Sequence, residues 1–586
     1  MVLAGSSAML AGPASARENF PDPGFPVVPC SSASQKAVLT EDAQLDPSCI
    51  YSGGIEVTAS DVTLDCRGAS VATAAENGSG IRVRTPANVD MSGITVRNCV
   101  VSGFQNSIRV TREGFRALPA GEEYDHVLED VTLTGNHVSG SHGVGIYVDG
   151  YVTDVTITDT TITDAGSSGI YLEAGSANNL VEGNQILENG FGENGPGGQI
   201  EEVGGLRYRF WGTGREGISI DGSRRNVIRD NTLTGNSAGG IYLYTNCGEY
   251  FNSKPSTYFQ RRYGATGNLI TGNRLSDGVS GVWVGARMGE SMLPMDCADP
   301  AYFHSGMTQI TRDRAAGNTV SDNLFDDMTY GVRVEDDDTK VTGNSFSGTD
   351  EGQYAVIVGT PYRTTELGEP VSGTELTGNI SMIAGNPSPY RWVDGETGST
   401  GSGNVALGQE STLCEGKSLP RGPFVMTIVV VYEPAGSPVT PTPANLRIPP
   451  VGPQPPCIGD RPPPEPGPPD PEDPIPPDQV PPSNQFTIGG VKLNPKQGTA
   501  TLSVKVPGPG QIRLRGTGTT KPEAKTARAA GTVRLTLRAK GATAGKLRRR
   551  GKAKVKATVT FTPTGGTSAT KKRSVTLVRK AAARRG

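Results

Sequence analysis

The sequence predicts an all-β protein: a long coil of short parallel strands, then a proline-rich linker, then a small antiparallel β-sandwich. Three observations predict it. Two strand-like phrases recur between residues 50 and 410, proline dominates residues 434–484, and apolar and polar side chains alternate over residues 485–580. Hydrophobic residues make up 35% of the chain whereas Gly reaches 79, which favours stacked repeats because each layer covers the next.

The N-terminal segment has the composition of an export signal. Residues 1–16 are small and apolar and end in Ala14-Ser15-Ala16, an A-x-A pattern typical of signal-peptide cleavage sites, although the usual basic opening is missing. A disordered Ala/Gly-rich terminus is the alternative. We therefore expect a protein that is secreted or associated with the cell wall. Residues 17–60 are expected to cap the coil, because an open end exposes unpaired strand edges.

The repeat has two phrases. The first is Gly-Ile or Gly-Val at the start of an alternating strand, and it returns after 24 residues from Gly145 to Gly169 and after 23 from Gly217 to Gly240. The second is an apolar strand followed by Asn. Stacking the rungs at about 4.8 Å would place inward Ile, Val and Leu in columns and the Asn amides in a ladder. The expected Asn column is Asn98, Asn136, Asn184, Asn231, Asn273, Asn323, Asn344 and Asn379.

These repeats resemble those of the pectin-lyase-like superfamily, and the NosD-like and C5-epimerase-like repeats are the most similar. The resemblance covers about residues 50–410 and implies a right-handed parallel β-helix, which we place at residues 61–410. It is specific for fold and weak for activity. The Asp-Pro-His-Asp signature of alginate epimerases is absent, as are the paired Asp and Gly-His-Gly signatures of polygalacturonase-like hydrolases.

The segments after the coil differ from it in composition. Residues 411–433 contain an apolar run that is expected to cap the second end. Residues 434–484 should form an extended polyproline linker. Residues 485–580 resemble the basic Ig-like modules of exported actinobacterial proteins, and residues 581–586 are a basic tail.

Charge divides at the linker. Residues 486–586 hold 25 Lys or Arg and one acid, Glu523; the whole chain has 55 basic and 59 acidic residues, so residues 1–485 hold 30 and 58. The basic part is expected to bind an anionic cell-wall polymer. Phe486 and Phe561 are its only aromatic residues, so we expect no specific nucleic-acid recognition.

Eight cysteines without a C-x-x-C pair predict disulfides in an exported chain. We expect Cys30 to pair with Cys49 in the cap and Cys247 with Cys297 between two long loops, and Cys457 is a candidate partner for Cys414. No resident metal ion is expected, although Ca²⁺ could be held by Asp296 and Asp299 or by the acidic turn 336–338. No apolar run approaches the roughly 18 residues that a membrane span needs, and we expect a monomer.

Strand alternation predicts two outward columns beside the Gly-Ile phrases. One comprises Arg82, Arg109, Tyr147, Tyr171, Ser219, Tyr242, Trp283 and Arg333, and the other Arg84, Thr111, Asp149, Glu173, Asp221, Tyr244, Gly285 and Glu335. Three long insertions, residues 189–214, 245–267 and 287–317, flank this surface. Insertions of that length in a tightly wound coil are usually functional.

Aromatic rings stack on sugars, arginines clamp carboxylates, and carboxylates perform acid–base chemistry. The candidate substrate-binding residues are Tyr147, Tyr171, Tyr242, Tyr244, Trp283, Arg261 and Arg333, and the candidate catalytic residues are Asp149, Glu173, Asp221, Glu249, Asp296, Asp299 and Arg287. They predict an extracellular protein that binds a polysaccharide and cleaves or epimerises it, as a lyase, hydrolase or epimerase. The alternative is a non-catalytic adhesin or wall-associated glycan binder, in which outward Tyr and Asp merely suit strands and turns in water.

Overall fold

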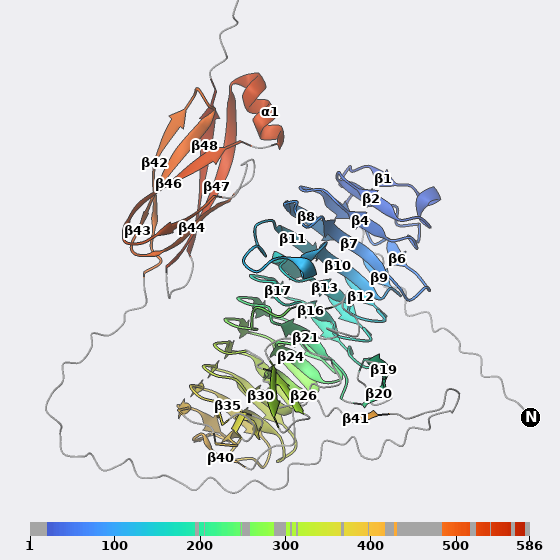
Figure 1. Ribbon diagram of the computed structural model, residues 1–586, viewed down its shortest axis with the longest axis vertical. Helices are drawn as coiled ribbons and strands as arrows, with labels where there is room; N and C mark the ends of the chain where they lie inside the picture. The colour runs from blue at the N-terminus through green and yellow to red at the C-terminus, as the bar shows by residue number, and fades with distance from the viewer. Residues whose placement is uncertain are drawn as a thin grey trace, which may run out of the picture. The chain divides into compact units, whose positions relative to one another are not determined.

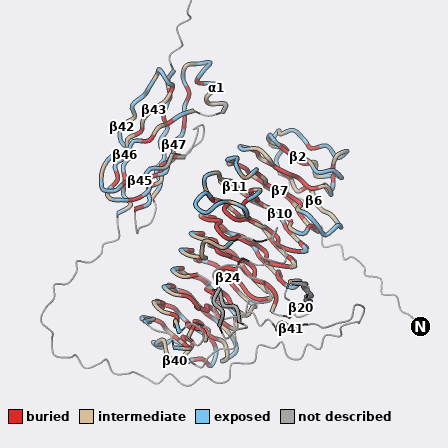
Figure 2. Tube along the Cα trace, viewed as in Figure 1, coloured by how far each residue is buried: buried red, intermediate tan, exposed pale blue. Residues whose placement is uncertain are grey.

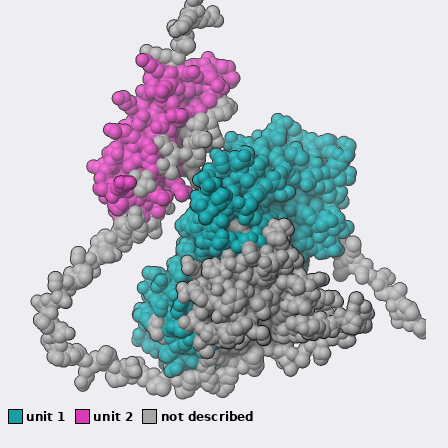
Figure 3. Space-filling model, in the orientation of Figure 1, with its two compact units in different colours: residues 1–461 teal, residues 462–586 magenta. Residues whose placement is uncertain are grey.

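The structure is a computed structural model. It describes residues 20–193, 199–203, 206–211, 213–246, 248, 258, 260–285, 301–304, 308–311, 315–361, 363–364, 368–395, 398–416, 427–430, 483–515, 523–539, 541–563 and 569–579. The chain divides into two compact units, residues 1–461 and 462–586 (Figure 3). No described helix is both long and apolar enough to cross a membrane.

The first unit is a coil of parallel strands with three walls (Figure 1). Wall 1 is a 13-stranded sheet. Its strands are β1 (Val27–Val28), β3 (Ala43–Leu45), β5 (Thr63–Asp65), β8 (Met91–Arg97), β11 (Leu128–Thr134), β14 (Thr153–Thr158), β17 (Leu180–Glu182), β22 (Val227–Arg229), β25 (Leu269–Thr271), β29 (Thr319–Ser321), β31 (Lys340–Thr342), β34 (Glu375–Thr377) and β37 (Thr400–Ser402).

Wall 2 follows wall 1 in each turn of the coil. It consists of β6 (Ser70–Ala72), β9 (Val100–Ser102), β12 (His137–Ser139), β15 (Thr161–Thr163), β18 (Gln185–Leu187), β23 (Thr232–Thr234), the first halves of β26 (Arg274–Val284) and β30 (Leu324–Val334), β32 (Ser345–Gly348), β35 (Ile380–Ile383), β38 (Val405–Ala406) and β39 (Gln409–Glu410). The final pair, β38 and β39, is antiparallel.

Wall 3 carries the Gly-Ile phrases. It consists of β2 (Ala37–Leu39), β4 (Ile55–Val57), β7 (Ser79–Thr85), β10 (Asn106–Arg112), β13 (Ile146–Val148), β16 (Ile170–Leu172), β21 (Glu216–Asp221), β24 (Gly239–Tyr244), the second halves of β26 and β30, β33 (Tyr354–Val358), β36 (Tyr390–Trp392) and β40 (Cys414–Glu415). Because β26 and β30 run through both walls, walls 2 and 3 join into one 23-stranded sheet.

The core lies inside the coil, where buried residues line the walls from end to end (Figure 2). Ile146, Ile170 and Ile218 are in direct register and have no exposed surface. The glycine before each of them sits at the corner between walls 2 and 3. A Cβ on Gly169 would lie 2.8 Å from the Ile186 side chain, and one on Gly240 would lie 2.3 Å from Leu275. The Gly-Ile phrase therefore exists because the corner has no room for a side chain.

The Asn ladder stands between walls 1 and 2. The Nδ2 group of each Asn donates to Oδ1 of the next at 2.8–3.0 Å, in the order Asn184, Asn231, Asn273, Asn323, Asn344, Asn379 and Asn404. Asn136 joins this column through Thr160. A second ladder of Asn179, Asn226, Asn268 and Asn318, which the sequence analysis missed, stands between walls 3 and 1.

The expectation for Asn98 was wrong by one residue. Asn98 occupies a partly buried left-handed turn with φ of 58°, and Cys99 takes the ladder position, donating its backbone N–H to Asn136 at 3.1 Å. Cys99 forms a disulfide with Cys66 one rung earlier. In the first rungs a covalent bond therefore stands where an amide pair stands later.

The remaining described elements of this unit are short. They are η1 (Cys30–Ser32), η2 (Phe115–Ala117), β19 (Gln199–Val203), β20 (Leu206–Trp211), β27 (Ala301–His304), β28 (Thr308–Thr311) and β41 (Thr427–Val430). Strands β27 and β28 form a hairpin. Strand β41, from the segment expected to cap the coil, pairs with β20 in the first long insertion.

The second unit has two antiparallel sheets around a shared core. One contains β42 (Thr487–Asn494), β43 (Thr499–Val506) and β46 (Gly531–Arg538), and the other contains β44 (Gly510–Arg515), β45 (Glu523–Ala527), β47 (Lys552–Pro563) and β48 (Ala569–Val578). Both sheets contribute to a core that includes Leu502, Val504, Ile512 and Phe561. The helix α1 (Gly541–Arg550) was not expected, because the alternating sequence around it indicated only strands.

Candidate functional site

The outer surface of wall 3 carries the two predicted columns. Arg109, Tyr147, Tyr171, Ser219, Tyr242, Trp283 and Arg333 are partners in direct register along successive strands. In the second column Asp221 is in register with Tyr244. Tyr147 and Tyr171 stack with ring centroids 5.0 Å apart and planes inclined by 16°.

A diagonal hydrogen-bond pattern links the two columns. The side chain in the first column donates to the carboxylate of the second column on the following rung. Arg109 binds both oxygens of Asp149 at 3.0 Å, the Tyr147 hydroxyl donates to Glu173 at 2.8 Å, and the Tyr171 hydroxyl donates to Asp221 at 2.7 Å. Three consecutive carboxylates are thus oriented by donors from the preceding rung.

Arg261 and Asn246 cover this carboxylate row. The Arg261 guanidinium lies 3.1 Å from Glu173 and 3.4 Å from Asp221, and the Asn246 backbone N–H donates to Asp221 at 2.7 Å. Asp221 consequently has no exposed surface and Glu173 is 3% exposed, and Asp149, which Arg109 binds, has no exposed surface either. Arg261, a candidate substrate-binding residue, therefore neutralises the row in this structure.

The segment that carries Arg261 is hydrogen-bonded to the loop of residues 113–127, which was not among the insertions chosen from the sequence. Arg262 donates to Glu123 at 2.7 Å and to the Leu118 carbonyl at 3.0 Å. Arg224 lies over the Tyr263 ring at 3.7 Å. The interval of 38 residues between the phrases at Ser107 and Gly145 was the sequence signal that could have identified this loop.

Asp149 and Glu173 ionise differently although they are neighbours. Burial raises the pKa of Asp149 and the nearby Glu173 charge adds to it, against the charge of Arg109. Burial opposes ionisation of Glu173 as well, but the charges of Arg261 and Arg116 and hydrogen bonds from Tyr147 and Arg261 outweigh it and lower its pKa. Burial also raises the pKa values of Tyr147 and Tyr171 well above 10, so both hydroxyls remain donors.

A second polar cluster, centred on Glu216, contacts Ser219, which stands in register between Tyr171 and Tyr242. One oxygen of Glu216 accepts from Ser219, from the Tyr244 hydroxyl at 3.0 Å and from Ser168 at 3.4 Å. Arg215 lies 3.4 Å from that oxygen and donates to the Tyr244 hydroxyl at 2.8 Å. The sequence analysis missed Arg215 and Glu216, although a carboxylate directly before a Gly-Ile phrase was unusual among the repeats.

The aromatic part of the surface continues along the coil and is also buried. Tyr242 and Trp283 meet edge to face with ring centroids 5.4 Å apart, and Tyr244 lies 5.9 Å from Trp283. Arg333 is 1% exposed and pairs with Glu335 on the same strand. These candidate binding residues therefore contact one another.

The first rungs of wall 3 are more open. Arg82, Arg84, Arg109 and Tyr147 are only partly buried. Arg84 pairs with Glu56 and lies 2.7 Å from Glu113, which is 41% exposed. A partly exposed row of arginines and one tyrosine thus leads to the buried carboxylates.

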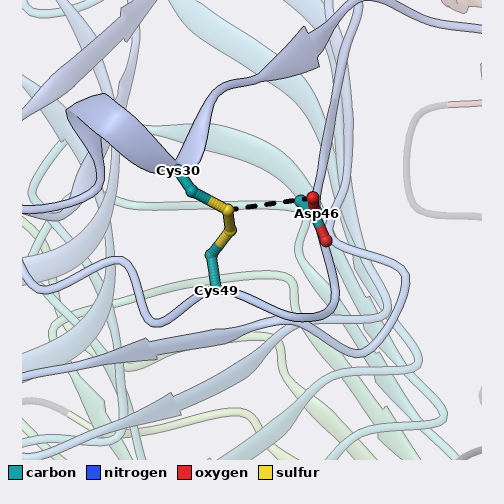
Figure 4. A group of neighbouring side chains, drawn as sticks. All are labelled: Cys30, Asp46 and Cys49. Carbon is teal, nitrogen blue, oxygen red and sulfur yellow. Dashed lines mark hydrogen bonds between the residues drawn. A yellow bond between two sulfur atoms is a disulfide. The ribbon is translucent and has the colours of Figure 1, made fainter.

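Several predicted site residues lie outside the described residues, namely Glu249, Arg287, Asp296, Asp299, Cys247 and Cys297. Cys30 and Cys49 form a disulfide in the cap (Figure 4). Asp46 Oδ2 lies 3.8 Å from Cys30 Sγ. These three residues are the one cluster of potential metal ligands among the described residues, and the disulfide occupies both sulfurs.

The acidic turn 336–338 forms ion pairs with an arginine. Arg363 Nη1 lies 3.0 Å from Asp336 and 2.9 Å from Asp337. Cys414 is disulfide-bonded, and its candidate partner Cys457 lies outside the described residues.

Comparison with known proteins concerns the coil. Residues 46–205 match the family described as right handed beta helix region. The chain is similar to an alginate lyase from Paenibacillus sp. str. FPU-7, with 17% identity over 58% of this chain and 92% of that chain and a TM-score of 0.33. It is also similar to the A-module of a mannuronan C-5 epimerase from Azotobacter vinelandii, with 16% identity over 65% of this chain and 92% of that chain and a TM-score of 0.38.

The catalytic domain of a GH87 alpha-1,3-glucanase in complex with nigerose is similar at 11% identity, over 63% of this chain and 62% of that chain, with a TM-score of 0.34. A search among curated protein sequences gave no match. Similarity at these identities concerns the fold alone. The stacked parallel walls, the Asn ladders and the family match identify the chain as a right-handed parallel β-helix protein.

Proposed function

We propose that the protein is an extracellular or wall-associated carbohydrate-active protein, which binds a polysaccharide along wall 3 and cleaves or epimerises it. The observation that carries this proposal is the diagonal row, in which Arg109, Tyr147 and Tyr171 orient Asp149, Glu173 and Asp221 on consecutive rungs. Burying three carboxylates is costly unless each is compensated. A surface with a purely structural role would therefore not be expected to carry such a row.

Asp149 and Glu173 supply the acid and the base in this proposal. Adjacent rungs lie about 4.8 Å apart, close to the roughly 5–5.5 Å between the carboxyl groups of retaining glycosidases. Neighbouring carboxyl groups whose pKa values shift in opposite directions suit a proton donor and a proton acceptor. Tyr147 holds Glu173 in place as a neutral donor.

The polymer would reach the row from the open rungs. Arg82 and Arg109 are partly exposed there, and their guanidinium groups suit the carboxylates or hydroxyls of a sugar chain. Arg261 would exchange its contacts with Glu173 and Asp221 for contacts with the substrate, since a guanidinium pairs equally well with the carboxylate of a uronate.

The test is a screen of the full chain against pectate, alginate and neutral glycans, which follows unsaturated products by ultraviolet absorbance together with new reducing ends. Asp149→Asn and Glu173→Gln should each lower turnover about 100-fold or more, as expected for loss of a general acid or base. The matched control is Asp326→Asn, which removes an exposed carboxylate from wall 2. Equal turnover in all four proteins would exclude catalysis by this row.

A non-catalytic glycan binder is the second candidate. The closed pairing of Asp149, Glu173 and Asp221 favours it, because every carboxylate of the row already has an Arg or Tyr partner. Saturable binding without any product, unchanged in Asp149→Asn, would select the binder over the enzyme.

The basic unit is proposed to retain the protein on an anionic wall polymer. A run of exposed cations leaves the last turn of α1 and continues along β47: Lys546, Arg548, Arg549, Arg550, Lys552, Lys554 and Lys556. Alternate residues of a strand repeat at about 6.6–6.8 Å on one face, so the lysines of β47 form a straight row suited to a regularly charged chain.

Two variants of equal charge test this retention. Lys552, Lys554 and Lys556→Ser should reduce binding of the full chain to immobilised teichoic acid about tenfold, and the interaction should weaken with salt. The control changes Lys492, Lys505 and Arg534→Ser, three exposed cations on the other sheet. Equal losses in both variants would show that net charge alone retains the protein.

A further inference from the structure

The Glu216 cluster has one feature that the carboxylate row lacks. Glu216 Oε2 is buried and has no hydrogen-bond partner among the described residues, and the same is true of Arg215 Nε. Glu216 has no exposed surface and Arg215 is 6% exposed. Since buried polar atoms are nearly always paired, an unpaired acceptor and an unpaired donor on consecutive residues require an explanation.

The aromatic column is interrupted at this cluster. Ser219 stands in direct register between Tyr171 and Tyr242, where a hydroxyl takes the place of a ring. Ser168 and Ser219 hydrogen-bond to each other at 2.6 Å beside the Glu216 carboxylate. The Glu216 carboxylate contacts both hydroxyls with its Oε1 atom, which leaves Oε2 for another donor.

The charges of Arg215 and Glu216 limit which ligand group this cluster can bind. Arg215 lies 3.4 Å from Glu216 and 3.7 Å from Glu193, so the guanidinium is balanced by carboxylates. A ligand anion would face Glu216, and a ligand cation would face Arg215. A hydroxyl satisfies both orphan atoms, because it donates one hydrogen bond and accepts another.

We infer that Arg215 and Glu216 form a subsite for a neutral sugar hydroxyl, beside Ser219 where the aromatic column is interrupted. This inference rests on the proposed binding of a polysaccharide along wall 3 and adds that the sugar unit here is read through a hydroxyl rather than an acidic group. Glu216 is thus a specificity-determining residue distinct from Asp221, which lies at the other end of the same strand.

The experiment measures the affinity of the full chain for pectate, alginate and laminarin by isothermal titration. Glu216→Gln replaces the free acceptor by an N–H donor at nearly constant volume. It should weaken binding of the recognised glycan about tenfold or more, as expected when a hydrogen bond to a charged group is lost. Glu182→Gln is the control, because Glu182 also pairs with an arginine, Arg229 at 2.7 Å, but lies on wall 1.

Glu216→Asp is a second variant, which keeps the experiment informative if Glu216→Gln misfolds. It keeps the charge opposite Arg215 while withdrawing the carboxylate by one methylene, so the fold should persist and the affinity should still fall. Unchanged affinity in both Glu216 variants would overturn the inference while leaving the proposed function standing, and would mean that water alone satisfies Oε2. Absence of binding by the wild type to every glycan would overturn the proposed function and this inference with it.

Discussion

Walls 2 and 3 belong to the same coil and have the same strand spacing, yet the outward side chains are exposed on one wall and mostly buried on the other. On wall 2 the outward residues Thr232, Arg274, Leu324, Ser345 and Ile380 lie in register and line an open hollow of about 370 Å³. Leu324 and Ile380 are 41% and 47% exposed. On wall 3 the column from Tyr171 to Arg333 and the carboxylates beside it are almost wholly buried, and only the first rungs are partly open.

The difference arises from the connections rather than the strands. Tight turns with the Asn ladder lead from wall 1 into wall 2, whereas the segments around Glu123 and Arg261 return over wall 3 and pair with it. Strand alternation decides which side chains point outward, and the returning segments decide whether those side chains meet water. An outward position in a β-helix therefore becomes a buried polar site only where a loop returns to it.

The largest expected effect is the loss of Arg261. Arg261→Ala leaves Glu173 and Asp221 buried without their cation, and breaking a buried pair typically costs about 3–5 kcal/mol. Arg274→Ala on wall 2 removes an exposed side chain and should change the free energy of unfolding by less than about 0.5 kcal/mol. Urea unfolding of both variants measures the contrast, and equal losses would show that wall 3 gains no stability from its covering arginine.

A smaller effect is expected in the Asn ladder between walls 1 and 2. Asn273→Ala removes the acceptor of the Asn231 backbone N–H and the donor to the Asn323 side chain. Leaving a buried group unsatisfied costs about 1–3 kcal/mol, so the variant should lose about 2–3 kcal/mol. Asn98→Gly should lose less, about 1 kcal/mol, because Asn98 lies in a left-handed turn outside the ladder and its side chain donates one part-buried hydrogen bond, to Asp65 at 3.0 Å. A comparable loss in Asn98→Gly would contradict the register described above.

The fold was predictable because its signals are periodic. Gly169 and Gly240 mark corners without room for a side chain, and the Asn column marks a turn that repeats on every rung. Asn98 was misplaced because the neighbouring Cys99 fits the same column by its backbone and disulfide rather than by an amide. A pattern based on one residue type misses a chemically different residue that fills the same place.

The candidate site was predictable only in part. Alternation placed Tyr147, Tyr171 and the row of carboxylates on one surface, because register follows from the repeat. The contacts of Arg261 could not be predicted, since they join residues 88 positions apart through a loop without periodicity. Glu216 was missed for a related reason: its carboxylate turns toward Ser219, and strand alternation says nothing of such a turn.

The smallest effect concerns acid stability and separates Glu173 from its neighbours. Its folded-state pKa lies below the ordinary value of 4.5, so Glu173 stabilises the fold above about pH 4.5 and loses that contribution as the pH falls further. Glu173→Gln should therefore be less stable than the wild type at neutral pH, with a difference that shrinks on acidification. Burial opposes the arginines at this residue, which keeps the effect below that of losing Arg261.

Asp149→Asn should show the opposite trend. The pKa of Asp149 is raised above 3.8, so ionising this carboxyl costs the folded state more than the unfolded state, and the Asn variant should gain relative stability as the pH rises beyond that value. Asp326→Asn on wall 2 is the exposed control. Urea midpoints between pH 3 and 7 would measure all three differences. Parallel profiles for Glu173→Gln and Asp149→Asn would mean that the two carboxyl groups titrate alike, and the acid–base assignment on wall 3 would then lose its physical basis.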